Sequence, residues 1–251
     1  MKKTFFIIVM MLVVQGQGVA YEISGIADAV NVAGKQRMYT MRMLRDYIMI
    51  GTHLHFEDPV ADLKHTLHDF EVSHMALKAY IQDPKLVAEL AKIEKHWDTI
   101  KATMKQPPVQ DQAASYAKNA IAFREMLNDF TNHLAKTSGK TESEAVNHSG
   151  RLRAVSQAIA AVYMLRIWDV PGSQKKMRIP MERFRSSLDY LRAAKTTKEP
   201  MKKVLAKLEK IYLFMDVINQ FSDMEPSLVI EKTNTMLELS NTLTQLYVKA
   251  H

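Results

Sequence analysis

Two stretches with the same layout decide the fold: "NVAGKQRMYTMRM" at residues 31–43 and "NHSGRLRAVSQAI" at residues 147–159. The glycine and the arginine occupy the same places in both, 116 residues apart. A second pair, "LAKIEKHW" at 90–97 and "LAKLEKIY" at 205–212, follows in the same order at a separation of 115. Matches in one order at one spacing indicate an internal repeat. The chain therefore reads as two copies of a unit of about 115 residues.

Helix start and stop signals predict four helices in each copy. Asp58-Pro59 and Asp83-Pro84 each combine a capping residue with proline at the first helical position. Thr141-x-x-Glu144 and Ser222-x-x-Glu225 are capping-box patterns. The expected helices span about 24–53, 58–82, 83–106, 111–136, 141–168, 180–195, 199–221 and 226–251, with a loop at "DVPGSQKK", residues 169–176.

The fold class that this pattern predicts is all-α. The chain has only eight glycines among 251 residues and no convincing strand pattern. Four amphipathic helices with short loops normally pack as a bundle, so we expect a tandem repeat of two four-helix-bundle units, residues 21–138 and 139–251. Two arrangements remain open: separate bundles in a row, or a side-by-side pair that imitates a symmetric dimer within one chain.

Residues 1–20 have the layout of a cleavable signal peptide. A basic start at Lys2 and Lys3 precedes an apolar run from Phe5 to Val14 and a small-residue tail that ends at Ala20. The apolar run is shorter than the roughly 20 residues of a spanning helix, which makes a retained anchor the weaker alternative. We expect export to the periplasm and a folded protein that begins near Tyr21.

Composition excludes several classes of function. The chain has no cysteine, so it can form no disulfide, thiolate metal site or covalent haem attachment. The formal net charge of +7 falls to +5 without Lys2 and Lys3, which suits an anionic ligand, and export makes nucleic acid an unexpected partner. No catalytic motif is present, and we expect no enzyme activity.

Histidines and methionines offer alternatives that the sequence favours less. The histidines at 53, 55, 65, 68 and 74 complete no metal-binding motif and are interpreted as solvated surface residues, so no metal site is expected. The methionines at 38, 41 and 43 follow helical spacing and are interpreted as packing residues rather than haem ligands. We therefore expect no cofactor.

An arginine interrupts the apolar stripe of each copy's first helix. Arg37 lies at the centre of the first stripe, and Arg153 occupies the matching position in the second copy. The apolar residues of the first stripe are Ile26, Val30, Ala33, Met41, Leu44 and Ile48. Gly34 and Gly150 flatten these helices beside Ala33 and Ser149, which favours close approach of two helices. An oxyanion between the two guanidinium groups would neutralise both charges. The alternative is a carboxylate partner, with Asp62, Asp69, Glu125 and Asp129 available in the first copy.

The first stretch resembles the N-x-A-G-x-x-R-M-x-x-x-R motif of the N-terminal sensory domain of type IV pili methyl-accepting chemotaxis transducers, the PilJ-type domain. It is also similar to the conserved box of the periplasmic domain of nitrate/nitrite sensor histidine kinases. That resemblance implies a four-helix bundle with one anion between two first helices, held by a motif arginine from each. By motif position these arginines are Arg37 and Arg153. The second copy departs from the motif, with Ala158 in place of Arg42 and Ala154 in place of Met38.

The resemblance implies an exported sensory protein for a small inorganic anion, with nitrate or nitrite the best candidates. The anion-binding residues would be Arg37 and Arg153, and the lining residues Ala33, Gly34, Met41, Ser149 and Gly150. The second arginine would come either from the same chain or from a homodimer partner that repeats Arg37. A membrane sensor kinase or chemoreceptor would receive the signal. The alternative function is a helical interaction module without a small ligand, which recruits such a partner or a pilus-associated protein.

Overall fold

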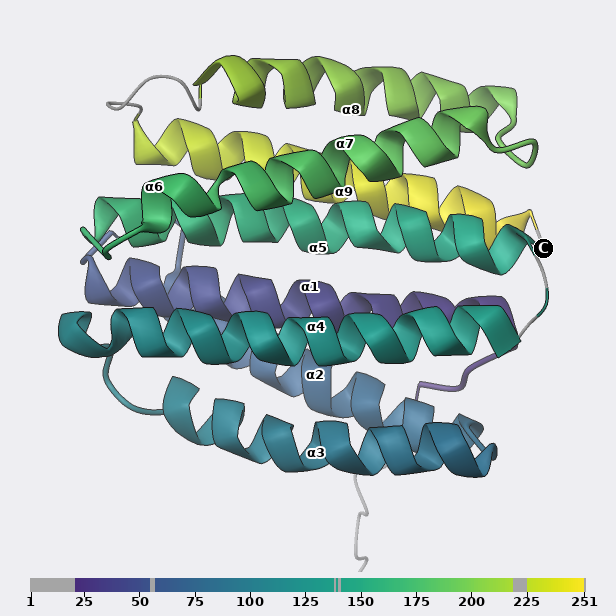
Figure 1. Ribbon diagram of the computed structural model, residues 1–251, viewed down its shortest axis with the longest axis horizontal. Helices are drawn as coiled ribbons and strands as arrows, with labels where there is room; N and C mark the ends of the chain where they lie inside the picture. The colour runs from purple at the N-terminus through teal and green to yellow at the C-terminus, as the bar shows by residue number, and fades with distance from the viewer. Residues whose placement is uncertain (1–20, 55–56, 138, 140, 219–224, 251) are drawn as a thin grey trace, which may run out of the picture.

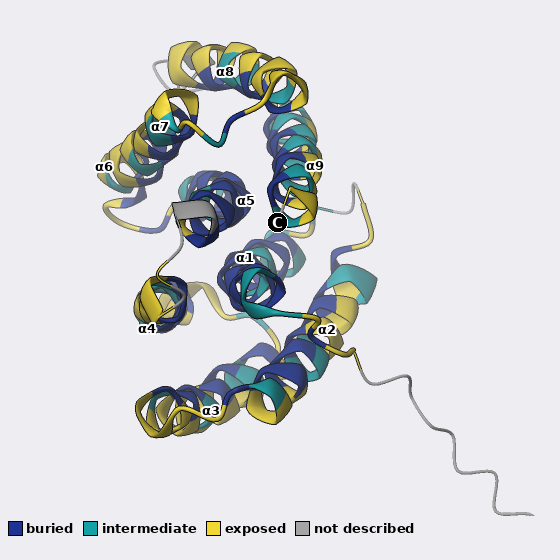
Figure 2. Cartoon of the chain, turned by 90° about the vertical axis from the view of Figure 1, so that its right-hand side faces the viewer, coloured by how far each residue is buried: buried dark blue, intermediate teal, exposed yellow. Residues whose placement is uncertain are grey.

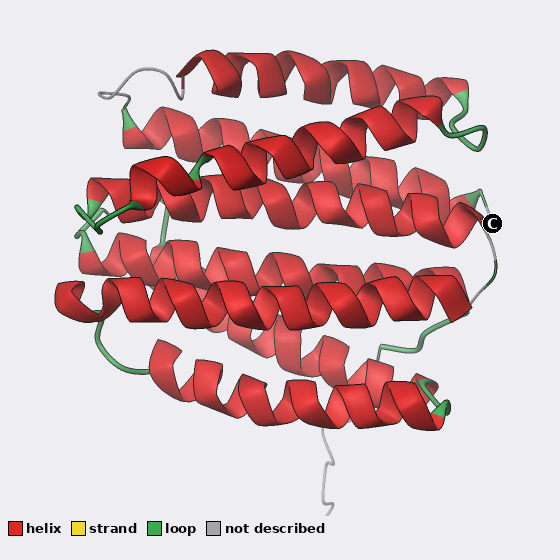
Figure 3. Ribbon diagram, in the orientation of Figure 1, coloured by secondary structure: helices red, strands yellow, loops and turns green. Residues whose placement is uncertain are grey.

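The computed structural model describes residues 21–54, 57–137, 139, 141–218 and 225–250, and within this part of the chain it is all-α, as predicted (Figure 3). Residues 1–20, where the sequence predicts a signal peptide, lie outside the described residues. The helices are α1 (Ile26–Gly51), α2 (Pro59–Tyr80), α3 (Pro84–Met104), the 3-10 helix η1 (Gln110–Gln112), α4 (Ala113–Thr137), α5 (Thr141–Ile167), α6 (Ser173–Lys176), α7 (Arg178–Ala193), α8 (Glu199–Ile218) and α9 (Pro226–Lys249).

The two aspartate-proline pairs begin helices as predicted. The Asp58 carboxylate accepts a hydrogen bond from the backbone N–H of Ala61 at 3.0 Å, and the Asp83 carboxylate accepts from Lys85 and Leu86. These bonds satisfy backbone donors that the first helical turn leaves without a partner. Proline at the next position loses nothing, because its nitrogen would have no helical acceptor there.

Other helix boundaries differ from the prediction. Gly25 takes the N-cap position of α1 in place of Ser24, whose hydroxyl and backbone N–H both donate to the Asp28 carboxylate. The predicted loop at 169–176 contains the short helix α6, and α7 begins at Arg178, two residues before Pro180. Gly172 allows this with a positive φ of 75°, a conformation that glycine adopts without strain. Ser222 lies outside the described residues, and Glu225 caps α9 without a side-chain bond.

The first helices of the two copies lie side by side at the centre of the molecule. Figure 1 shows α1 and α5 in the middle, with α2 and α3 beyond α1 and with α7 and α8 beyond α5. In the end view of Figure 2, α4 and α9 flank the central pair on opposite sides. Helix α5 packs on α1 more extensively than any other pair of described helices does. Of the two arrangements that the sequence leaves open, the structure shows the side-by-side one.

One hydrophobic core runs through both copies. It includes Val30 and Leu44 of α1, Phe70 of α2, Ile159 of α5 and Phe184 of α7. Helix α1 is buried around most of its circumference, as expected of a central helix. Met38, Met41 and Met43 are all buried, which confirms their interpretation as packing residues. No helix among the described residues is long and apolar enough to cross a membrane.

Candidate functional site between α1 and α5

Arg37 lies in the middle of α1 with its side chain directed into α5 and α4. It is 1% exposed. Its Nη1 donates to Asn147 Oδ1 at 2.8 Å and to Asn128 Oδ1 at 3.1 Å, and its Nη2 donates to the Asn147 carbonyl at 3.2 Å. All three acceptors are neutral oxygen atoms, so these bonds orient the guanidinium group without neutralising its charge.

Arg153 of α5 binds Asn31 of α1 in the same way as Arg37 of α1 binds Asn147 of α5. It too is 1% exposed, and it donates from Nη1 to Asn31 Oδ1 at 3.0 Å and from Nη2 to the Asn31 carbonyl at 3.2 Å. Asn31 and Asn147 are 116 residues apart, the same separation as the arginines. Each motif arginine is therefore bound by the first residue of the other copy's motif. This reciprocal exchange is the pattern of a twofold interface, realised here within one chain.

Gly34 and Gly150 make room for the two guanidinium groups at the point where α1 and α5 come closest. A Cβ atom on Gly34 would lie 3.1 Å from Arg37 Nη2, 3.2 Å from Arg153 Nη2 and 3.9 Å from Gly150 Cα. A Cβ atom on Gly150 would lie 3.0 Å from Arg153 Nη2 and 3.3 Å from Arg37 Nη2. Ala33, Met41 and Ser149 are also fully buried around this point. The structure thus brings both predicted arginines to one place.

The carboxylates that the alternative interpretation assigned to these arginines lie elsewhere. Asp62 pairs with Arg42 and Arg45, Glu125 pairs with Arg124 and Arg183, and Asp69 and Asp129 are exposed. Among the described residues, neither motif arginine forms an ion pair with a carboxylate. The carboxylate interpretation is therefore wrong for Arg37 and Arg153 in this part of the chain.

The electrostatic surroundings disfavour two charged groups here. Burial lowers the pKa of Arg37 well below its ordinary value, and the nearby Arg151, Arg153 and Arg124 lower it further. Burial also lowers the pKa of Arg153, to about 10. Both side chains keep a buried Nε with no hydrogen-bond acceptor among the described residues. The site therefore has spare donors and uncompensated positive charge, which an anion would satisfy.

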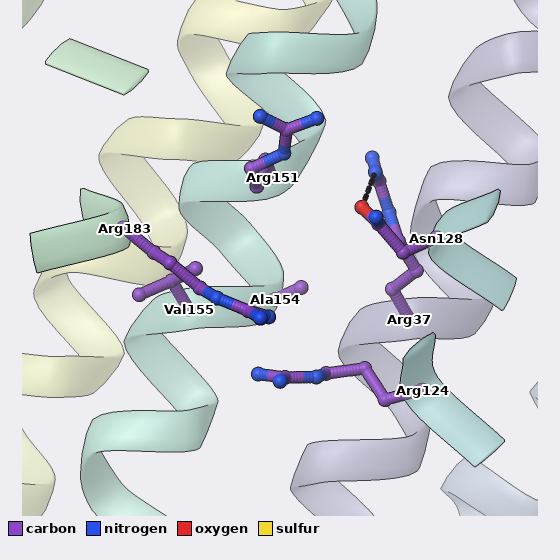
Figure 4. A pocket seen from close by; sticks show the side chains of 7 residues that line it. All are labelled: Arg37, Arg124, Asn128, Arg151, Ala154, Val155 and Arg183. Atoms are coloured by element: carbon purple, nitrogen blue, oxygen red, sulfur yellow. Dashed lines mark hydrogen bonds between the residues drawn. The ribbon is translucent and has the colours of Figure 1, made fainter. Parts of the chain in front are cut away.

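A pocket of about 170 Å³ opens on one side of this interface. Figure 4 shows its lining, to which four helices contribute an arginine: Arg37, Arg124, Arg151 and Arg183. Arg124, Arg151 and Arg183 were not predicted from the sequence. Arg151 stands inside the motif stretch, two residues before Arg153, and was the one signal available. Arg124 and Arg183 reach the pocket only through the packing of α4 and α7.

A second polar cluster ties α1 to α2, α5 and α9. Arg45 is 1% exposed and donates to Asp46, Asp62, Gln157 and Asn234. Arg42, the second motif arginine of the first copy, donates to Asp62 from Nε at 2.9 Å. Each of these arginines has a carboxylate partner, so this cluster is a structural ion-pair network rather than a site with spare positive charge.

The histidines do not form a metal site in the described residues. No group of three or more potential ligands comes together there. His65 and His68 are exposed as predicted, but His74 is buried and its Nδ1 lies 3.4 Å from Gln36 Nε2. The surface interpretation is wrong for His74, which fills the space between α1 and α2 and stacks on Phe70.

Comparison with known proteins gives a match for the first copy. Residues 21–123 match the family described as type IV pili methyl-accepting chemotaxis transducer N-terminal, PilJ. The match includes Gly34, Arg37 and the aspartate-paired Arg42 in α1, and it extends into α4. No curated protein and no solved structure matches the chain. This match confirms, over residues 21–123, the resemblance to the PilJ-type domain that the Arg37 motif carries.

Proposed function

We propose that this chain is a sensory protein that binds a small oxyanion between α1 and α5. The match of residues 21–123 to the PilJ family supports the sensory role. Nitrate and nitrite are the ligands that we favour, because a planar oxyanion presents several acceptors to two guanidinium groups at once. The site would lie in the periplasm, with residues 1–20 removed on export.

The observation that carries this proposal is the pair of fully buried arginines without a carboxylate. Burying a charged group is costly unless it is paired, and asparagine oxygens carry only partial charge. One monovalent anion would halve the formal charge of the two guanidinium groups, from +2 to +1. It would take the donors that Arg37 and Arg153 now leave free, including Nε of each. Because Arg153 supplies the second guanidinium group within one chain, the proposed site needs no second copy.

The experiment is thermal unfolding of the mature protein in nitrate, nitrite, sulfate, phosphate and chloride at constant ionic strength. A ligand at 100 times its dissociation constant adds about 2.7 kcal/mol to the free energy of unfolding. For a chain of this size, that corresponds to a rise in Tm of roughly 5–10 °C. Arg37→Ala and Arg153→Ala should each abolish the rise that nitrate or nitrite produces. Arg178→Ala, on the exposed face of α7, is the control.

Two outcomes of this experiment would contradict the proposal or part of it. Equal Tm values in all anions would remove the ligand from the proposal. A rise specific to nitrate or nitrite that survives both Arg37→Ala and Arg153→Ala would keep the ligand but place it elsewhere. Either outcome leaves the family of residues 21–123 untouched.

A second candidate function is protein recruitment by an exposed apolar face of α8. Leu213, Phe214 and Val217 stand on one side of this helix and are 51%, 40% and 55% exposed. An exposed apolar cluster is a common feature of interaction surfaces. In this version the chain would contact a membrane sensor kinase or chemoreceptor through α8. Phe214→Asp should then abolish receptor binding while leaving the anion response unchanged.

A further inference from the structure

We propose that the pocket lined by Arg37, Arg124, Arg151 and Arg183 is a second site, specific for a small oxyanion with two or more negative charges, of the phosphate class. This goes beyond the monovalent anion proposed between α1 and α5. The two sites share only Arg37, which contacts the interface with its Nη atoms and borders the pocket.

The pocket is built by four helices from both copies. Arg37 comes from α1, Arg124 and Asn128 from α4, Arg151, Ala154 and Val155 from α5, and Arg183 from α7. In Figure 4 the side chains of Arg124 and Arg183 point toward one another from opposite walls. Its volume of about 170 Å³ suffices for a tetrahedral oxyanion with some of its water.

The charge around this pocket is unbalanced. Glu125 is its one carboxylate partner among the described residues, and a single oxygen, Oε1, accepts from both Arg124 and Arg183. Arg151 donates to the neutral Asn132 Oδ1 at 3.2 Å, and Arg37 donates only to asparagines. Four guanidinium groups therefore face one carboxylate. A monovalent anion would leave two positive charges uncompensated, whereas a divalent or trivalent oxyanion would neutralise most of them.

Arginines that line this pocket lower the pKa values of their neighbours by electrostatic repulsion. The pKa of Arg124 is lowered by burial and by Arg183, although Glu125 opposes this. The pKa of Arg151 is lowered by burial and by Arg183. The fold keeps like charges close without full compensation, which is the arrangement that pre-organises an anion site.

A pocket of about 180 Å³ occupies the repeat-related position beside the α1–α5 interface, but its charge is different. The positions 116 residues before Arg151 and Val155 are Lys35 and Tyr39, and these line a pocket there with Tyr21 and Asp69. One lysine faces one aspartate in that pocket, so it has no excess of positive charge. Both pockets lie at equivalent positions of the two repeats, but only the pocket with Arg124 and Arg183 is strongly basic. This difference argues that the basic pocket is not a by-product of the fold.

The test is a calorimetric titration of the mature protein with inorganic phosphate, and separately with nitrate, at fixed ionic strength. Arg183→Gln removes a charge that is partly exposed and should leave the fold intact. We expect this variant to bind phosphate at least tenfold more weakly. Arg178→Gln, an exposed arginine on the same helix, should bind phosphate within twofold of the wild type. Arg151→Gln removes a second positive charge, from the α5 side of the pocket, and should weaken phosphate binding as Arg183→Gln does.

Arg153→Gln separates this inference from the proposed function, because Arg153 contributes to the interface and does not line the pocket. It should abolish nitrate binding and retain phosphate binding. The inference is overturned if the wild type binds no phosphate, or if Arg183→Gln and Arg151→Gln both bind it as tightly as Arg178→Gln does. If the protein binds phosphate but not nitrate, only the proposed site between α1 and α5 is contradicted. If it binds nitrate but not phosphate, only the proposed phosphate site in the pocket is contradicted.

Discussion

Each motif residue has a defined task at the contact of α1 and α5. Arginine supplies the donors, glycine allows both guanidinium groups to lie against the backbone, and asparagine supplies the acceptors for the other copy's arginine. The sequence predicted the first two tasks, because a buried arginine and a mid-helix glycine each oppose the local preference of a helix. It did not predict the asparagine contacts. Those depend on the register between two helices more than 100 residues apart.

Gly51, the last residue of α1, is required by packing rather than by the motif. A Cβ atom there would lie 2.5 Å from Cζ2 and Cη2 of Trp168 and 3.0 Å from Pro108. We expect Gly51→Ala to lower the free energy of unfolding by about 1–3 kcal/mol, since the indole ring must move within a packed core. Urea unfolding at neutral pH measures this loss.

Gly25→Ala is the matched control for this substitution. Nothing lies within 4 Å of a Cβ atom at Gly25, and its φ of 170° is extended backbone that any residue adopts. The cost should stay below about 1 kcal/mol, the scale of a changed N-cap. Equal losses in Gly51→Ala and Gly25→Ala would show that the Trp168 contact does not constrain the end of α1.

At the scale of elements, helix starts with a strong local signal were predictable, and those fixed by packing were not. Asp58-Pro59 and Asp83-Pro84 begin α2 and α3 because capping acts within one turn. Helix α6 and the early start of α7 escaped prediction, since "VPGSQKK" reads locally as a loop. Ser173 and Met177 are buried in this segment, which indicates that packing against α5 favours the helical turn there.

The ion-pair network between α1 and α2 makes a pH-dependent contribution to stability. Burial, opposed by Arg45 and reinforced by Asp62, raises the pKa of Asp46 to about 7. A carboxyl group whose pKa is raised on folding stabilises the protein fully below its unfolded pKa, near 4, and loses that contribution as pH rises through about 7. The unpartnered Asp46 Oδ2 is consistent with a group that resists ionisation.

The substitution Asp46→Asn tests the direction of this change of stability with pH. Asparagine keeps the Oδ1 acceptor for Arg45 Nε, which lies 2.7 Å away in the wild type, and it cannot ionise. Between pH 5 and pH 8, the wild type should lose of the order of 1 kcal/mol or more relative to this variant, since one pKa unit corresponds to about 1.4 kcal/mol. Urea unfolding of both proteins at the two pH values gives the comparison. A difference that is constant with pH, or that favours the wild type at pH 8, would be inconsistent with a raised pKa.

At the scale of the whole molecule, the repeat predicted two similar halves but left their arrangement open. The decisive feature was the burial of α1 and α5 against each other, which sequence patterns within one half cannot reveal. The arginine pocket belongs to the same category, because it needs α1, α4, α5 and α7 together. We propose that residues 21–138 and 139–251 are repeats that share one core rather than bundles that fold independently.

This arrangement predicts one cooperative unfolding transition for both halves. The two tryptophans lie in different copies, Trp97 in α3 and Trp168 just after α5, and both are buried. Fluorescence of the Trp97→Phe and Trp168→Phe variants therefore reports on each half alone. In each variant, the fluorescence transition should coincide with the loss of helix measured by circular dichroism. A fluorescence midpoint clearly separated from the circular dichroism midpoint would indicate independent domains.

A nitrate titration by calorimetry decides whether Arg37 and Arg153 hold one anion between them, as we propose. We expect one nitrate per chain for the wild type and no detectable binding for Arg37→Gln or for Arg153→Gln, because each guanidinium group supplies half of the site. Nitrate binding that persists in both variants, or that is absent from the wild type, would contradict this proposal.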